Sequence, residues 1–156
     1  MITEKPVFDY LADLAQKSDD PRTKIAGAIQ LLGDHWYFAY NNSIIFGVDL
    51  STEEKYTYIE HVERQLIYNC AKVGASTQGA TMYLLFEPCV ECARAIALSG
   101  VSKIVVCDAV RQHVPERWKE SLQKAKEILK QRGVKIEYDP VLVGKTIWFN
   151  NEEVNI

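Results

Sequence analysis

Apolar residues near the start of the chain recur every three to four positions, which is the spacing of one helix face. Val7, Leu11, Leu14 and Ala15 follow this spacing until a cluster of turn-forming residues at 18–21. The pattern therefore predicts a first helix that ends before residue 18.

The next segment has the spacing and composition of two strands. Residues 25–32 and 36–40 are rich in β-branched, aliphatic and aromatic side chains, and they flank the dipeptide Gly33-Asp34. Glycine and aspartate suit the backbone of a tight hairpin turn. We expect a β-hairpin here, followed by a loop over residues 41–52.

Helical and β-type patterns alternate over the rest of the chain. Helices are predicted from 61 to Gly74, over 90–99 and over 116–132, and strands over 81–86, 103–107, 134–138 and 146–149. Such alternation is typical of an α/β sandwich whose sheet is covered by helices on both faces. No linker or repeat divides the 156 residues, so we predict a single domain over residues 1–156.

Composition narrows the classes of function. The chain is 47% hydrophobic and 25% charged, which excludes a disordered, collagenous or coiled-coil protein. Its net charge of −3 provides no general attraction for a polyanion, which argues against nucleic acid as a partner. No apolar run approaches the roughly 20 residues of a membrane span, and the first ten residues do not have the pattern of a signal peptide. We therefore predict a cytoplasmic protein with no membrane association.

The segment Pro88-Cys89-Val90-Glu91-Cys92 places a C-x-x-C pair at the start of a predicted helix. Residues three apart share a helix face, and the helix N-terminus lowers the pKa of a thiol, so both sulfurs could bind one metal ion. A redox pair, half of a zinc finger and a chance match are equally compatible with the isolated motif.

A catalytic zinc site needs three protein ligands and one open position. Cys70 and Cys107 stand singly within apolar patterns and are interpreted as core thiols. The candidate third ligand is His61, which begins an H-x-E motif with Glu63. Alone, H-x-E is more typical of a structural histidine and a first-turn acid, but H-x-E followed by P-C-x-x-C is the signature of zinc nucleobase deaminases.

At these motifs the chain resembles the cytidine and deoxycytidylate deaminase superfamily, most closely its dCMP deaminase branch. The resemblance extends over residues 7–138. It is carried by residues 18–29, Tyr40-Asn41, 60–64, 79–83, 92–101, 117–121 and 133–136.

The resemblance implies a three-layer α/β/α fold around a mixed five-stranded sheet, with one Zn²⁺ per subunit held by His61, Cys89 and Cys92. It implies that Glu63 takes a proton from water, delivers it to N3 of the pyrimidine and later protonates the amine that leaves C4. The expected reaction converts dCMP to dUMP and ammonia. Relatives of this kind also imply a homo-oligomer, from dimer to hexamer.

For substrate contacts, the resemblance implies a hydrogen bond from Asn41 to the sugar or base. Asparagine is also a common turn residue, so a purely structural role stays open for Asn41. The backbone N–H of Val62 and the carbonyl of Glu87 are expected to read the pyrimidine edge. A substrate phosphate needs cationic donors, and no spacing singles out one candidate. The candidates are Arg22, Lys24, Arg64 and Arg111.

Several residues depart from the pattern of the branch near the expected substrate, among them Val62, Glu87 and the apolar loop at 42–47. A deaminase of a nucleoside, a free base or a modified pyrimidine therefore stays an alternative, and so does an enzyme that edits tRNA or single-stranded DNA. A zinc-binding interaction module without activity is a third. The basic residues of the helix at 116–132 are interpreted as a solvated face.

Overall fold

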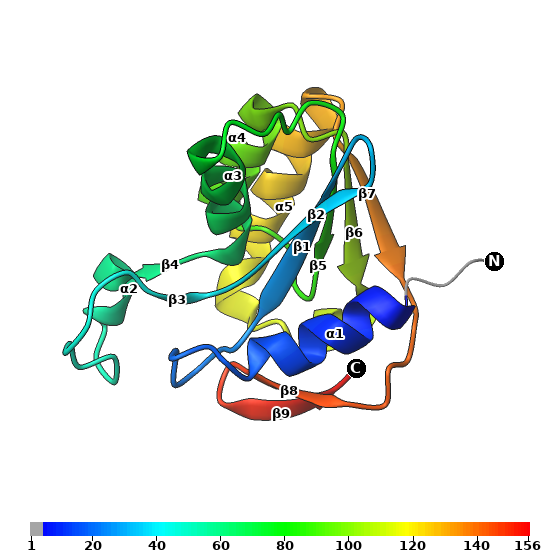
Figure 1. The fold of residues 1–156 in the computed structure, drawn as a ribbon. Helices are drawn as coiled ribbons and strands as arrows, with labels where there is room; N and C mark the ends of the chain where they lie inside the picture. The colour runs from blue at the N-terminus through cyan, green and yellow to red at the C-terminus, as the bar shows by residue number, and fades with distance from the viewer. Residues whose placement is uncertain (1–4) are drawn as a thin grey trace.

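The computed structural model of the protein describes residues 5–156 (Figure 1). A central sheet has the strand order β2-β1-β5-β6-β7. Its strands are β1 (Ala26–Leu31), β2 (His35–Tyr40), β5 (Thr81–Leu84), β6 (Lys103–Cys107) and β7 (Lys135–Asp139). β1 is antiparallel to both β2 and β5, whereas β5, β6 and β7 are parallel, so the expected mixed five-stranded sheet is confirmed.

Helices cover one face of this sheet completely and share the other face with a hairpin (Figure 1). The first face carries α3 (Val62–Lys72), α4 (Val90–Ser99) and α5 (Glu116–Gln131). The second carries α1 (Lys5–Ala15) and the hairpin of β8 (Thr146–Phe149) and β9 (Glu152–Asn155). The α/β/α sandwich is confirmed. β9 was not predicted, because only Val154 of its four residues is buried and the segment carries no alternating apolar pattern.

Two apolar clusters lie on the two sides of the sheet. One joins α1 and the hairpin to the sheet through side chains such as Phe8 and Phe149, and the other packs α3, α4 and α5 through Leu66, Ile96 and Leu129. Cys107 is fully buried in the first cluster and Cys70 in the second, which confirms both as core thiols.

The predicted hairpin turn is also confirmed. Gly33 and Asp34 both have positive φ angles, of 86° and 64°. Leu31 pairs with His35, so residues 32–34 form the turn, and glycine and aspartate adopt a positive φ more readily than most residues. Local turn chemistry thus sets the register of β1 against β2.

Residues 41–60 form an arm that leaves the body of the sheet and returns to it (Figure 1). Where only a loop was expected, β3 (Asn42–Ser43) pairs with β4 (Ile59–Glu60), and α2 (Lys55–Tyr58) precedes β4. A buried ion pair, in which Lys55 Nζ lies 2.8 Å from both carboxylate oxygens of Asp20, fastens the arm to the loop after α1.

No helix within residues 5–156 is both long enough and apolar enough to cross a membrane.

The 3₁₀ helix η1 (Asp108–His113) follows β6 and leads into α5. It was not predicted from the sequence, since a 3₁₀ helix of six residues is too short to show a recognisable periodicity.

Candidate active site

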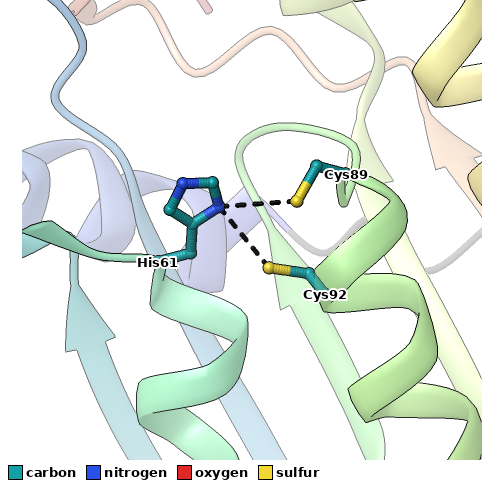
Figure 2. Close-up of side chains that lie close together, drawn as sticks. All are labelled: His61, Cys89 and Cys92. Atoms are coloured by element: carbon teal, nitrogen blue, oxygen red, sulfur yellow. Dashed lines mark hydrogen bonds between the residues drawn. The ribbon is translucent and has the colours of Figure 1, made fainter. Parts of the chain in front are cut away.

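The two sequence motifs meet at the N-termini of neighbouring helices. His61 is the N-cap of α3 and Cys89 is the N-cap of α4, and both have extended backbone angles. Cys92 lies one turn into α4. Figure 2 shows the imidazole of His61 directed at the two sulfurs from the facing helix. Residues that are far apart in the sequence therefore form one cluster, as the motifs predicted.

The distances within this cluster fit a tetrahedral zinc ion. His61 Nδ1 lies 3.6 Å from Cys89 Sγ and 3.5 Å from Cys92 Sγ, and all three ligand atoms lie within 4.8 Å of one another. Tetrahedral bonds of about 2.3 Å to sulfur and about 2.0 Å to nitrogen separate the two ligand atoms by about 3.5 Å. One histidine and two cysteines are also a ligand set that leaves a fourth position open, as catalytic zinc sites do.

Protonation of the cluster also favours a cation at its centre. The hydrogen bond from Cys92, together with the one from His61, lowers the pKa of Cys89. The same contact with Cys89, together with burial, raises the pKa of Cys92, because two thiolates this close repel each other. A divalent metal ion would compensate both negative charges, and it could then hold both sulfurs as thiolates.

An ionic bridge outside the cluster ties the two helix starts together. Glu60 Oε1 accepts hydrogen bonds from the backbone N–H of His61 at 2.8 Å and from Arg64 Nε at 2.7 Å. Arg64 in turn pairs with Glu91 Oε2 at 3.1 Å, in the first turn of α4. The bridge holds the segment that presents His61 against the helix that presents Cys89 and Cys92.

Glu63 lies beside the cluster with its carboxylate buried. The residue is 3% exposed, and its Oε2 atom has no hydrogen-bond partner among the described residues. Burial raises the pKa of Glu63, so this carboxylate takes up a proton at a higher pH than an ordinary glutamate. A buried carboxylate without a partner is costly for stability, and such groups concentrate at functional sites.

A cavity of about 290 Å³ opens at this cluster and extends toward the loop after α1. His61, Glu63 and Cys89 line its inner end. Arg22, Arg117 and Asn150 are among the residues that line the rest. The volume is close to the lower end of the range for small-molecule sites. The cavity therefore extends from the metal cluster and the carboxylate of Glu63 to the guanidinium groups of Arg22 and Arg117.

Some of the groups predicted to contact the substrate already have partners within the protein. Asn41 lines the cavity, but its Oδ1 accepts a hydrogen bond from Ile25 N and its Nδ2 donates to Thr23 O. Its amide thus ties the cavity wall together, as a turn residue would, and one N–H of the amide group remains. Val62 is the first residue of α3, where backbone N–H groups have no partner within the helix. Glu87 lines the cavity, and its side chain is paired with two cations.

Of the four candidate phosphate ligands, Arg22 lines the cavity and the other three do not. Arg22 contacts Glu53 and the carbonyl of Ser51 on the arm. Lys24 donates to Ser18 O, and Arg64 belongs to the bridge between the helix starts. Arg111 pairs with Asp108 and Glu87. Arg22 is therefore the one of the four candidates that is placed to contact a phosphate in the cavity.

Arg117 lines the cavity, although the sequence analysis did not propose it as a phosphate ligand. It is the second residue of α5, and its guanidinium contacts Asn150 Oδ1 at 3.3 Å and the ring of Trp118 at 5.3 Å. No carboxylate within residues 5–156 forms an ion pair with it. In the sequence it stands among several basic residues of one amphipathic helix, so charge alone could not distinguish it from them. Lys55 and Tyr56 of the arm also line the cavity, and they lie between the predicted loop at 41–52 and the predicted helix from 61, where the sequence analysis assigned no element.

The protein is therefore an α/β/α sandwich whose His-Cys-Cys cluster is the ligand set of a catalytic zinc site. Residues 4–108 match the family model described as the cytidine and deoxycytidylate deaminase zinc-binding region, and the chain belongs to this family.

Three known proteins extend this comparison. The chain is 42% identical over 65 residues to deoxycytidylate deaminase of Enterobacteria phage T2, a match that spans 42% of this chain and 34% of the relative. It is 28% identical over 132 residues to ComE operon protein 2 of Bacillus subtilis, across 80% of this chain and 64% of the relative. The crystal structure of dCMP deaminase from cyanophage S-TIM5 in complex with dCMP and dUMP superposes with a TM-score of 0.67 at 20% identity, covering 88% of this chain and 99% of that one. This last likeness concerns the fold.

We expect zinc binding to depend on Cys89 and not on a thiol outside the cluster. Cys89→Ala removes one of three ligands, so the variant should retain well under half of the zinc that the unmodified chain carries, which is expected to be about one ion per chain. Cys70→Ala is the matched control and should keep all of it. Metal content after dialysis against a weak chelator, measured by mass spectrometry, tests this. Full zinc occupancy in Cys89→Ala would contradict the ligand set.

Proposed function

We propose that the protein is a zinc-dependent hydrolase that deaminates a cytosine nucleotide, dCMP to dUMP and ammonia. The observation that carries the proposal is the unpartnered, buried Oε2 of Glu63 next to a cluster whose distances suit zinc. Membership of the deaminase family and the printed names of the phage relatives support the same reaction. The proposed ligands are His61, Cys89 and Cys92.

In this reaction Glu63 moves the protons. A zinc ion bound at the cluster supplies the Lewis acidity that makes water reactive near neutral pH. Glu63 accepts a proton from the attacking water and donates it to N3 of the ring. It then takes the remaining proton from the new hydroxyl on C4 and gives it to the amine, as the bond from C4 to that nitrogen breaks and the C4 carbonyl forms. The raised pKa of Glu63 suits a group that must both accept and return a proton. Ammonia leaves, and a uracil product remains.

The cavity wall offers groups to orient the pyrimidine. We propose that the backbone N–H of Val62, the carbonyl of Glu87 and the remaining amide N–H of Asn41 contact the base or the sugar. Val62 is 2% exposed and Asn41 is 4% exposed, so contacts made there are shielded from water. Hydrogen bonds in such surroundings discriminate strongly, because a substrate that lacks the matching group leaves a buried polar atom unpaired.

The cationic end of the cavity favours a nucleotide over a nucleoside. Arg117 has no carboxylate partner within residues 5–156, and Arg22 is held by Glu53, whose side chain is 75% exposed. Ion pairs with a solvent-exposed partner contribute little, so a phosphate could take over Arg22 at small cost. Guanidinium groups bind phosphate oxygens in pairs of parallel hydrogen bonds. We propose Arg117 and Arg22 as the phosphate ligands.

Replacing Glu63 by glutamine should stop turnover without releasing the metal. Glu63→Gln keeps the shape of the side chain but cannot carry a proton, and general acid–base assistance is typically worth about 10² to 10⁴ in rate. We expect ammonia release from dCMP to fall by at least about 10²-fold, with zinc content unchanged. The control is Glu120→Gln, which alters an exposed acid of α5 that pairs with Lys124 and does not line the cavity. A zinc-loaded Glu63→Gln protein with normal turnover would rule out the proposed role.

Neutralising Arg117 should raise KM for dCMP and leave deoxycytidine turnover unaffected. A hydrogen bond between charged groups is worth about 1.5 to 3 kcal/mol, which corresponds to a rise of about 10-fold to 100-fold in KM. Ammonia release is measured with both substrates for Arg117→Met and for Lys119→Met, an exposed control two residues along α5. Equal rates on dCMP and deoxycytidine in the unmodified protein would identify a nucleoside enzyme. Activity on neither would direct the search to free bases, modified pyrimidines or polynucleotides.

We further propose a cytoplasmic homo-oligomer. The four cysteines are free, as expected in a reducing compartment. The arm exposes Ile44 by 70% and leaves Phe46 fully exposed, and apolar side chains grouped in this way are typical of contact surfaces. Sedimentation velocity should give the mass of a dimer or a larger assembly, and Phe46→Ser should reduce it. A monomeric unmodified protein would contradict the assembly.

A further inference from the structure

Glu87 has a buried carboxylate that the proposed reaction does not use. Its residue is 5% exposed, and its Oε1 atom lies 3.0 Å from Lys126 Nζ of α5 and 3.6 Å from Arg111 Nε of η1. The geometry of both contacts is that of ion pairs and not of directed hydrogen bonds. The cavity is lined by Glu87 but by neither cation, so the carboxylate is held from outside the cavity.

The two cations share a second partner. The guanidinium carbon of Arg111 lies 4.0 Å from the ring centre of Tyr138 on β7, and Lys126 Nζ lies 5.6 Å from it. Burial and the nearby carboxylate of Glu87 raise the pKa of the Tyr138 phenol. Three elements, η1, α5 and β7, thus converge on one carboxylate. We call Glu87, Arg111, Lys126 and Tyr138 the Glu87 clamp.

The residue before Glu87 is anchored by the same part of the chain. The ring of Phe86 packs against Trp118 of α5 and Phe149 of β8, with ring centres 5.9 Å and 4.7 Å apart. All the side chains that hold Phe86 and Glu87 in these contacts come from residues 111–149. The zinc-binding family region ends at residue 108. Side chains from the C-terminal third of the chain therefore hold in place the loop that leads into the C-x-x-C motif.

The link from Glu87 to the sulfur of Cys89 is short and stiff. Pro88 has a fixed φ angle, and a proline restricts the residue before it to extended conformations. Few backbone torsions remain free between Glu87 and Cys89, the N-cap of α4. A shift of the Glu87 backbone therefore moves Cys89 relative to His61, which is presented by a different helix.

We propose that Glu87 is a positioning residue whose clamp by Lys126 and Arg111 sets the place of Cys89 in the metal cluster. The inference rests on the zinc site proposed above. Partners that orient metal ligands from outside typically change metal affinity by about 10-fold to 100-fold when they are removed. Loss of one cation leaves a buried carboxylate less compensated, so the loop should shift to hydrate it.

Lys126→Met is the discriminating variant. Removing a positive charge near a site for Zn²⁺ should strengthen metal binding if charge alone mattered. We expect the opposite, a loss of about 10-fold to 100-fold in zinc affinity, together with a changed visible spectrum of the cobalt(II)-substituted protein. Affinity is measured by competition with a chromophoric chelator. Lys124→Met is the matched control, since it makes the same charge change on the same helix, where Lys124 pairs only with Glu120.

Two further variants keep the test decisive. Lys126→Arg retains the cation and should restore affinity and spectrum. If Lys126→Met does not fold, the cobalt(II) spectrum of Glu87→Gln carries the test, because the spectrum reports ligand geometry and Glu87 is not itself a ligand. A Lys126→Met protein with the affinity and spectrum of Lys124→Met, or a Glu87→Gln protein with an unaltered spectrum, would overturn the clamp. Both readouts are independent of turnover, so a zinc-loaded protein without deaminase activity would reject the proposed function and leave this inference intact.

Discussion

The structure depends on two helix N-termini that meet closely enough for an imidazole to contact two sulfurs at 3.5 Å and 3.6 Å. Residues at helix starts are well suited to this, because the local dipole stabilises thiolates and the first N–H groups are free to bind a ligand. The meeting is possible because α3 and α4 pack side by side on one face of the sheet, and the bridge through Glu60, Arg64 and Glu91 holds their starts together.

The site carries several buried charges, and each has a different relation to its surroundings. Asp20 and Lys55 neutralise each other in the cavity wall and fasten the arm. Glu87 is balanced by cations that approach from outside the cavity. Glu63 Oε2 has no hydrogen-bond partner among the described residues, and no ion pair within residues 5–156 balances its carboxylate. Buried charges lower stability unless they are paired, so the unpaired one marks the position where proton transfer is expected.

The C-terminal third of the chain completes a site whose metal ligands all lie earlier. Trp118 and Phe149 pack around Phe86, Lys126 and Tyr138 hold Glu87, and Arg117 and Asn150 close the cationic end of the cavity. Residues outside the family region therefore contribute to the cavity and hold the loop before the C-x-x-C motif. Specificity residues carried by peripheral segments can change without disturbing the core of the sheet.

The sequence by itself determined most helices and strands of the sandwich and the candidate ligands of the metal cluster. Helical periodicity, the Gly33-Asp34 turn and the paired motifs at 61–63 and 88–92 are local patterns, and local patterns persist in the fold. Only the tertiary structure decided which cation faces the cavity. Arg22, Lys24, Arg64, Arg111 and Arg117 are alike in charge, and their roles differ because neighbours from distant segments pair with some and leave Arg117 free of any carboxylate within residues 5–156. The side chain of Glu87 is a similar case, since its partners lie 24 or more residues away. Such long-range pairing depends on how the helices and strands pack, and no spacing along the chain encodes it.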